Sequence, residues 1–141
     1  MKILVDTSVW SLAFRKKTLT KDEEKIVNEL KELIYEIRVV IIGPIRQELL
    51  SGLSNKAKFV NLIEKLRAFD DTPIEQNDYE KAAKFYNSCR KKGIQGSHID
   101  FLICAIAINR DIGIFTTDKD FENYKEILNI KLHKVRETLE K

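Results

Sequence analysis

The amino-acid sequence predicts an α/β fold with three layers, α/β/α, in which helices cover both faces of a parallel sheet of about five strands. Short, mostly β-branched apolar segments alternate along the chain with longer segments of helical periodicity. This alternation is typical of parallel sheets, because each crossover between parallel strands has room for a helix. The predicted strands are 2–5, 38–42, 68–69, 113–116 and 129–133.

The composition agrees with one globular domain spanning 1–141. Of the 141 residues, 43% are apolar and 33% are charged, which suits a protein with a single hydrophobic core. Cys89 and Cys104 have no metal-binding spacing, so we expect two buried thiols in a reducing compartment. The sequence shows neither a secretory signal nor a membrane-spanning stretch, and we therefore expect a cytoplasmic protein without membrane contact.

Apolar residues that recur every three or four positions predict the helices. In chain order these are 8–14, 21–36, 45–52, 55–66, 77–92, 98–110 and 119–127. Thr20 and Glu23 have the spacing of a capping box at the start of the second helix. Gly43 and Pro44 end the second strand and begin the third helix, because proline fits the first helical turn.

The last two long helices have clear boundaries as well. Asn77 or Asp78 can cap the helix at 77–92, and Gly93 ends it after a basic last turn. The segment IDFLICAIAI is apolar around its whole circumference except for Asp100, which predicts a helix buried on most sides. A charge is unfavourable there, although a place in the first helical turn would stabilise it.

Four acidic residues follow or lie close to predicted strand ends. They are Asp6 after the first strand, Glu48 shortly after the second, Asp100 at the start of the buried helix and Asp118 after the strand at 113–116. The carboxyl ends of parallel strands meet at one edge of an open sheet, where ligands bind. We therefore expect the four carboxylates to gather there, although each of them singly has a capping or surface role available.

Gathered carboxylates repel one another unless a cation neutralises them. A donor set made only of oxygen atoms favours Mg²⁺ or Mn²⁺ over zinc. These ions polarise phosphoryl groups and activate water, so the pattern indicates cleavage of phosphodiester bonds.

Four segments of the sequence resemble the PIN-domain nucleases, and in particular the VapC-type toxins of toxin–antitoxin pairs. The segments are ILVDTSVW, GPIRQELLSG, RKKGIQGSHIDFLICAIAI and FTTDKDF. They occur in the order found in the family and span residues 3 to 121. The resemblance implies a PIN-like fold over nearly the whole chain.

The resemblance also implies which residues act. Asp6, Glu48, Asp100 and Asp118 would form the catalytic acidic centre. Asp6, Asp100 and Asp118 would hold Mg²⁺ or Mn²⁺, directly or through water. Glu48 would bind the metal from an outer shell or orient the attacking water.

Further polar residues would support this centre. Thr7 or Ser8 would bond to a carboxylate or to water on the metal, and Asp120 is an adjacent acidic candidate. Ser97 would either hydrogen-bond within the site or cap the helix that contains Asp100.

The activity implied by the resemblance is endonucleolytic hydrolysis of RNA with water as the nucleophile, and the implied partner is a cognate antitoxin protein. One alternative is a non-catalytic PIN-like module that binds RNA or protein. Another is a PIN nuclease of RNA processing rather than a toxin. The apolar hairpin at 45–66 suits a homodimer or a partner helix, or else it packs on its own domain.

Two basic clusters are candidates for binding the RNA backbone. They are Arg15, Lys16 and Lys17 after the first helix, and Arg90, Lys91 and Lys92 at the end of the fifth. The net charge of +3 permits this role without requiring it, and solvated helix ends also explain such runs. His98 is two residues from Asp100 and would point elsewhere, so we do not expect it to be a base. Aromatic residues at helical positions, including Tyr86, are expected in the core.

Overall fold

The computed structural model describes residues 1–137 and contains a parallel sheet of three strands. They are β1 (Ile3–Val5), β2 (Val39–Val40) and β3 (Gly113–Phe115). Their order is β2-β1-β3, with Ile3 opposite both Val39 and Gly113. The central strand β1 is fully buried. The α/β fold class with a parallel sheet is thus confirmed.

The sheet is narrower than the five strands expected. Within the described residues, the strands predicted at 68–69 and 129–133 are replaced by isolated parallel bridges, Ile41 with Asp71 and Ile114 with Leu132. Next to the first bridge, Thr72 N–H donates to the Ile41 carbonyl at 2.9 Å. The residue after Thr72 is Pro73, which has no N–H to extend the pairing. Five chain segments therefore lie side by side, but the outer two pair only at single positions.

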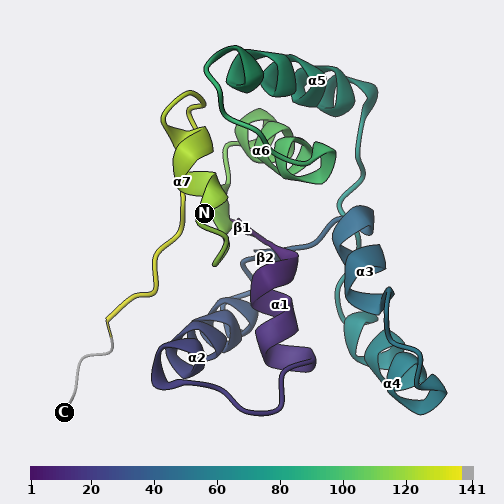
Figure 1. The fold of residues 1–141 in the computed structure, drawn as a ribbon. Coiled ribbons are helices and arrows are strands. Elements are labelled where there is room, and N and C mark those ends of the chain that lie inside the picture. Colours follow the sequence, from purple (N-terminus) through teal and green to yellow (C-terminus); the bar gives the residue numbers. More distant parts are fainter. Residues whose placement is uncertain (138–141) are drawn as a thin grey trace.

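Seven helices surround the sheet in the described part of the chain. They are α1 (Thr7–Phe14), α2 (Lys21–Tyr35), α3 (Gly43–Leu50), α4 (Lys56–Leu66), α5 (Gln76–Lys91), α6 (His98–Arg110) and α7 (Asp120–Lys125). Figure 1 shows α5 and α6 on one side of the strands and α1 and α2 on the other. Among the described helices, none has the length and apolar character needed to cross a membrane.

Local sequence signals set several helix boundaries as predicted. The Thr20 side chain accepts from Glu23 N–H at 3.2 Å, and the Glu23 carboxylate accepts from Thr20 N–H at 2.9 Å. This capping box opens α2. The helix α3 begins at Gly43 and carries Pro44 in its first turn. Gly93 follows α5 with φ +79°, a left-handed conformation that glycine adopts without strain.

The start of α5 differs from the prediction. The helix begins at Gln76 and its N-cap residue is Glu75, so Asp78 lies in the first turn and takes part in capping from there, as the acceptor of Glu75 N–H in a capping box. Asp78 is 2% exposed and accepts two hydrogen bonds from Arg110, at 2.8 and 2.9 Å. It also accepts one from the Asn109 side chain at 2.8 Å and one from Glu75 N–H at 2.8 Å. Asp78 therefore joins α5 to the end of α6.

The helix α6 runs through the core. All its residues from 101 to 107 are buried, which confirms the interpretation of its all-round apolar sequence. Cys89 of α5 and Cys104 of α6 are free, buried thiols.

The hairpin of α3 and α4 packs partly on its own domain. Leu49, Leu62 and Leu66 are buried in the common core, and Leu50 and Leu53 are partly buried against it. The hairpin thus has a structural use for much of its apolar surface, and a role in dimerisation or partner binding stays a prediction.

The C-terminal segment is fastened to α2 by a buried carboxylate. Glu29 is 5% exposed and contacts His133 Nε2 at 2.6 Å and Arg136 Nε at 2.8 Å. Arg136 also pairs with Glu36 at 3.0 Å. His133 is accordingly a structural residue and mostly buried.

Candidate active site

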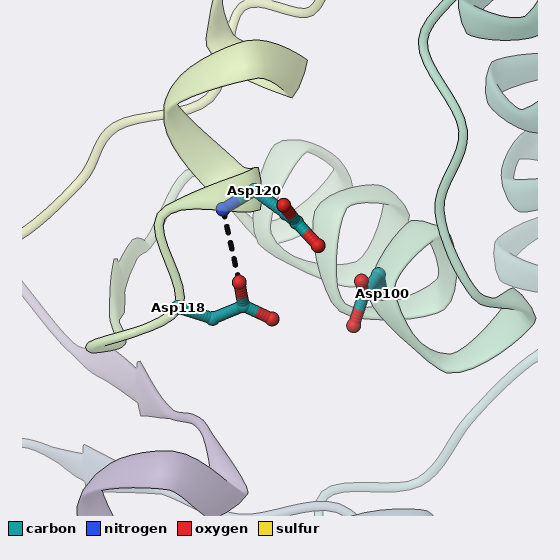
Figure 2. A group of neighbouring side chains, drawn as sticks. All are labelled: Asp100, Asp118 and Asp120. Atoms are coloured by element: carbon teal, nitrogen blue, oxygen red, sulfur yellow. Dashed lines mark hydrogen bonds between the residues drawn. The ribbon is translucent and has the colours of Figure 1, made fainter.

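Three carboxylates converge at the carboxyl edge of the sheet. Asp118 lies in the loop after β3, Asp120 begins α7, and Asp100 lies in the first turn of α6. Figure 2 shows the three side chains directed toward a common space between these elements. One carboxylate oxygen of each lies within 4.8 Å of those of the other two. Asp100 thereby shares one small volume with residues 18 and 20 positions later in the sequence.

Hydrogen bonds to the backbone hold the loop that carries two of these acids. Asp118 Oδ1 accepts from Asp120 N–H at 2.9 Å, as marked in Figure 2. Asp118 N–H in turn donates to the Thr116 hydroxyl at 3.0 Å. The turn after β3 thus sets the positions of both carboxylates before any ligand binds.

Asp6 lies beside this group at the end of β1 and is 7% exposed. It is the N-cap residue of α1, which is the ordinary structural role considered for it. Its Oδ2 also accepts from the Ser8 hydroxyl at 2.7 Å and from the Thr116 hydroxyl at 2.8 Å. The Ser8 hydroxyl accepts from Thr117 N–H at 3.0 Å. Asp6 and Ser8 therefore tie the ends of β1 and β3 together.

Glu48 is placed apart from the three converging acids. It is exposed on α3, and its Oε1 accepts from the Thr7 hydroxyl at 2.7 Å. Thr7 is the first residue of α1, so this hydrogen bond links α3 to the helix that Asp6 caps. The structure brings together Asp100, Asp118 and Asp120, sets Asp6 next to them, and leaves Glu48 on the rim.

Tyr124 positions the Asp100 side chain through a hydrogen bond. The tyrosine is completely buried, and its hydroxyl donates to Asp100 Oδ2 at 2.6 Å. Gly96 allows this approach, because a Cβ at that position would lie 2.7 Å from Cζ of the Tyr124 ring. Ser97 caps α6 by accepting from Asp100 N–H at 3.0 Å. The Tyr124 bond restricts the orientation of the Asp100 carboxylate, and the Ser97 bond fixes the backbone that carries it.

Burial and neighbouring charge shape the electrostatics of Asp100. Burial is the main cause that raises its pKa above the ordinary value of 3.8, and the charges of Asp118 and Asp6 raise it further. Hydrogen bonds from Tyr124 and at Ser97 act in the opposite direction. Burial also raises the pKa of Tyr124, followed by its hydrogen bond to Asp100, so the tyrosine remains a donor.

The chain's relation to known proteins agrees with this geometry. Residues 3–127 match the sequence pattern of the PIN domain. The chain belongs to the PIN domain family. PIN domains are generally nucleases and use divalent metal ions. No curated protein sequence matches the chain closely enough to add to this assignment.

Solved structures show the same PIN fold. FitAcB from Neisseria gonorrhoeae superposes with a TM-score of 0.74 at 23% identity, over 94% of this chain and 96% of that one. VapBC2 from Rickettsia felis, bound to a DNA fragment from its promoter, gives 0.75 at 18% identity, over 94% and 98%. VapBC-5 from Mycobacterium tuberculosis, a member of the VapBC family of toxin–antitoxin systems, gives 0.66 at 19% identity, over 94% and 97%.

The donor atoms of this PIN domain fit a hard divalent cation. Every candidate ligand in the converging group is a carboxylate oxygen, with no histidine or cysteine among them. Mg²⁺ and Mn²⁺ prefer such oxygen donors. A doubly positive ion would offset both the burial of the Asp100 charge, which is the main cause of its raised pKa, and the repulsion from Asp118 and Asp6.

Three residues that support the acids were missed in the sequence. Thr116 belongs to the FTTDKDF segment, where only its acids drew attention. Tyr124 lies four residues after Asp120, a helical spacing that places the two on one face. Gly96 precedes Ser97, and only the packed position of Tyr124 explains why glycine is needed there.

The basic clusters predicted to bind RNA lie on exposed helix ends. They comprise Arg15, Lys16 and Lys17 beyond α1, and Arg90, Lys91 and Lys92 at the end of α5. Lys16 pairs with Glu23 at 2.6 Å, and Arg90 lies over the ring of Tyr86. Their contact with RNA stays a prediction.

Proposed function

We propose that this PIN domain is a metal-dependent endoribonuclease that hydrolyses RNA phosphodiester bonds and acts as the toxin of a toxin–antitoxin pair. The convergence of Asp100, Asp118 and Asp120 beside Asp6 carries the proposal. Carboxylates this close together favour binding of a cation, and the complete acidic set favours catalysis over mere binding of RNA.

Asp100, Asp118 and Asp120 would hold Mg²⁺ or Mn²⁺ here, with Asp6 contributing from the end of β1. When bound, such an ion polarises a phosphoryl oxygen and favours ionisation of a water molecule. The chain supplies the orientation of the ligands: Tyr124 and Ser97 fix Asp100, and the turn from Thr116 fixes Asp118.

Hydrolysis requires a water molecule to form a new P–O bond while the bond to the leaving ribose oxygen breaks. A carboxylate must accept the water proton, and the leaving oxygen takes a proton from solvent water at the exposed rim of the site. Glu48 suits the first task, because it is exposed at the rim and its second oxygen is free of the Thr7 hydrogen bond. No residue of the site is needed as a covalent nucleophile.

The toxin role is supported by the structural neighbours. FitAcB and the two VapBC structures share the fold over nearly their whole length, and VapBC-5 is described as part of a toxin–antitoxin system. We therefore expect a cognate antitoxin protein. This antitoxin, encoded by a gene beside that of the PIN domain, should bind the PIN domain and stop RNA cleavage.

The decisive experiment measures cleavage of single-stranded RNA with added Mg²⁺ or Mn²⁺. Asp6→Asn keeps an acceptor for Ser8 and Thr116 but removes the charge, so the rate should fall about 100-fold or more. Asp70→Asn is the matched control, because Asp70 is exposed and outside the site. Equal cleavage by wild type and Asp6→Asn, or cleavage that persists in EDTA, would refute the assignment.

A further inference from the structure

An aromatic stack lies at the start of α6, close to the acidic centre but facing α5. The ring of His98, the first residue of α6, stacks on Tyr86 of α5 with centroids 5.0 Å apart and an interplanar angle of 18°. Arg90 lies over the same tyrosine, 5.9 Å from its centroid, and donates to its hydroxyl at 2.9 Å. His98 and Arg90 are exposed, whereas Tyr86 is half-buried.

Packing joins this stack to the acidic centre. Phe101 meets Tyr86 edge to face, with centroids 5.7 Å apart, and lies 4.9 Å from Tyr124 on its other side. Tyr124 is the residue that hydrogen-bonds Asp100. Gly96 touches both parts, since it lines the small hollow beside Tyr86 and abuts the Tyr124 ring. The stack is therefore held at a fixed place relative to the acids.

The stack has the features of a surface that binds unpaired bases. Nucleobases of single-stranded RNA stack on tyrosine, histidine and arginine planes, with little dependence on sequence. One face of the His98 ring packs on Tyr86, and because His98 is exposed, a further ring can stack on its outer face. Arg90 adds a positive charge at the edge, where a phosphate of the same strand would lie.

We propose that His98 and Tyr86 form a stacking platform for one nucleobase of the RNA, next to the phosphate that is cleaved, with Arg90 contacting the backbone. The proposal rests on the proposed ribonuclease function and adds a substrate subsite to it. His98 acts here through its ring face and not as an acid or base. It is two residues from Asp100 and its ring is directed to α5.

Binding can be measured without cleavage in the Asp6→Asn background, using fluorescein-labelled single-stranded oligoadenylate. His98→Ala should weaken binding by about tenfold, in keeping with the effect of removing one stacked base contact. His98→Tyr preserves a stacking ring and should bind within about threefold of the parent. Tyr79→Ala is the matched control, because Tyr79 is an aromatic of the same helix α5 that is 55% exposed and outside the stack.

Two outcomes would overturn the platform. One is equal binding by His98→Ala and the parent, and the other is a loss in His98→Tyr as large as in His98→Ala. In the active enzyme, His98→Ala should raise KM more than it lowers kcat, because a binding contact away from the reacting atoms is lost.

Abasic substitution locates the contact. Removing one base at a time from the oligoadenylate should weaken binding most at a single position. In His98→Ala, removing the base at that position should cause no further loss of affinity, whereas the losses at other positions should be unchanged. A penalty that persists unchanged in His98→Ala would contradict the platform. If the wild-type chain neither binds nor cuts RNA, the ribonuclease function fails and the platform with it. Normal RNA cleavage with an unchanged KM in His98→Ala refutes the platform alone.

Discussion

Asp100 shows how a single residue can trade stability for function. Its side chain lies just before the buried apolar residues 101–107 of α6, where burial and the neighbouring carboxylates disfavour its charge. Tyr124 and Ser97 offset part of this penalty through hydrogen bonds. A residue with this environment is expected at a site that gains from holding negative charge, because folding alone would be better served by a neutral side chain.

Replacing Asp100 should therefore stabilise the metal-free protein. The folded-state pKa of Asp100 is raised, so the folded protein binds a proton more tightly than the unfolded chain does. Stability is consequently lost as pH rises from 3.8 through the folded pKa. At neutral pH, Asp100→Asn should raise the melting temperature by roughly a few degrees while removing RNA cleavage.

The melting temperatures of wild type and Asp100→Asn can be compared in EDTA, at neutral and mildly acidic pH, by monitoring circular dichroism during heating. The gain from Asp100→Asn should shrink as the solution becomes acidic, because the wild-type carboxyl then takes up its proton. Asp70→Asn, at an exposed position, serves as the control. A melting temperature lowered by Asp100→Asn at neutral pH would show that charge at this position stabilises the fold.

At the scale of elements, a largely buried ion pair reinforces the packing of α5 against α6. Arg110 holds the pKa of Asp78 below its ordinary value of 3.8, and the two side chains are joined by two hydrogen bonds. Removing one partner of a buried ion pair destabilises by roughly 3–5 kcal/mol, and the partial exposure of Arg110 reduces this to about 2 kcal/mol. Asp78→Asn should therefore lower the free energy of unfolding by about that amount.

Urea unfolding at neutral pH measures this loss. The pKa of Asp78 is lowered in the folded state, so its contribution is present above pH 3.8 and declines as the pH falls below that value. The difference between wild type and Asp78→Asn should narrow accordingly. Glu64→Gln is the control, since Glu64 and Arg67 form an exposed pair 3.9 Å apart. A loss that stays constant in acid would exclude the ion pair as its cause.

The sequence predicted helices better than strands because helix ends carry their signals locally. The capping box at Thr20 and Glu23 and the Gly43-Pro44 signal depend on residues within one turn. Both signals were identified in the sequence, although α3 begins two residues before the predicted range of 45–52. Pairing at a sheet edge depends on a distant partner. The segment at 68–69 is apolar, yet the bridge forms only at Asp71, because the backbone of a neighbouring strand selects the register.

Those site residues were predictable whose place relative to a strand end is enough to bring them together. Asp6 directly follows β1 and Asp118 lies in the loop after β3, so the parallel sheet sets them at one edge. The contacts of Tyr124 with Asp100 and of Thr116 with Asp6 arise from packing between elements. No local pattern encodes such contacts, and these supporting residues were therefore found only in the structure.

At the scale of the whole molecule, the acidic centre exists only when the chain is folded. Its carboxylates come from the end of β1, the start of α6, the loop after β3 and the first residue of α7. In the unfolded chain these segments are far apart, so a cation that binds the assembled centre must stabilise the entire fold by linkage. Thermal unfolding of the molecule thus reports on the centre independently of catalysis.

Mn²⁺ should raise the melting temperature of the wild-type protein. A ligand at 100 times its Kd stabilises by about 2.7 kcal/mol, which corresponds to a shift of roughly 5–15 °C for a domain of this size. Asp118→Asn should remove most of the shift, and Asp70→Asn should keep it. The shift should also shrink in mild acid. The raised pKa of Asp100 favours its protonated form there, and Mn²⁺ must displace that proton to bind. The same shift in Asp118→Asn, or none at millimolar Mn²⁺, would mean that the carboxylates converge without forming a metal site.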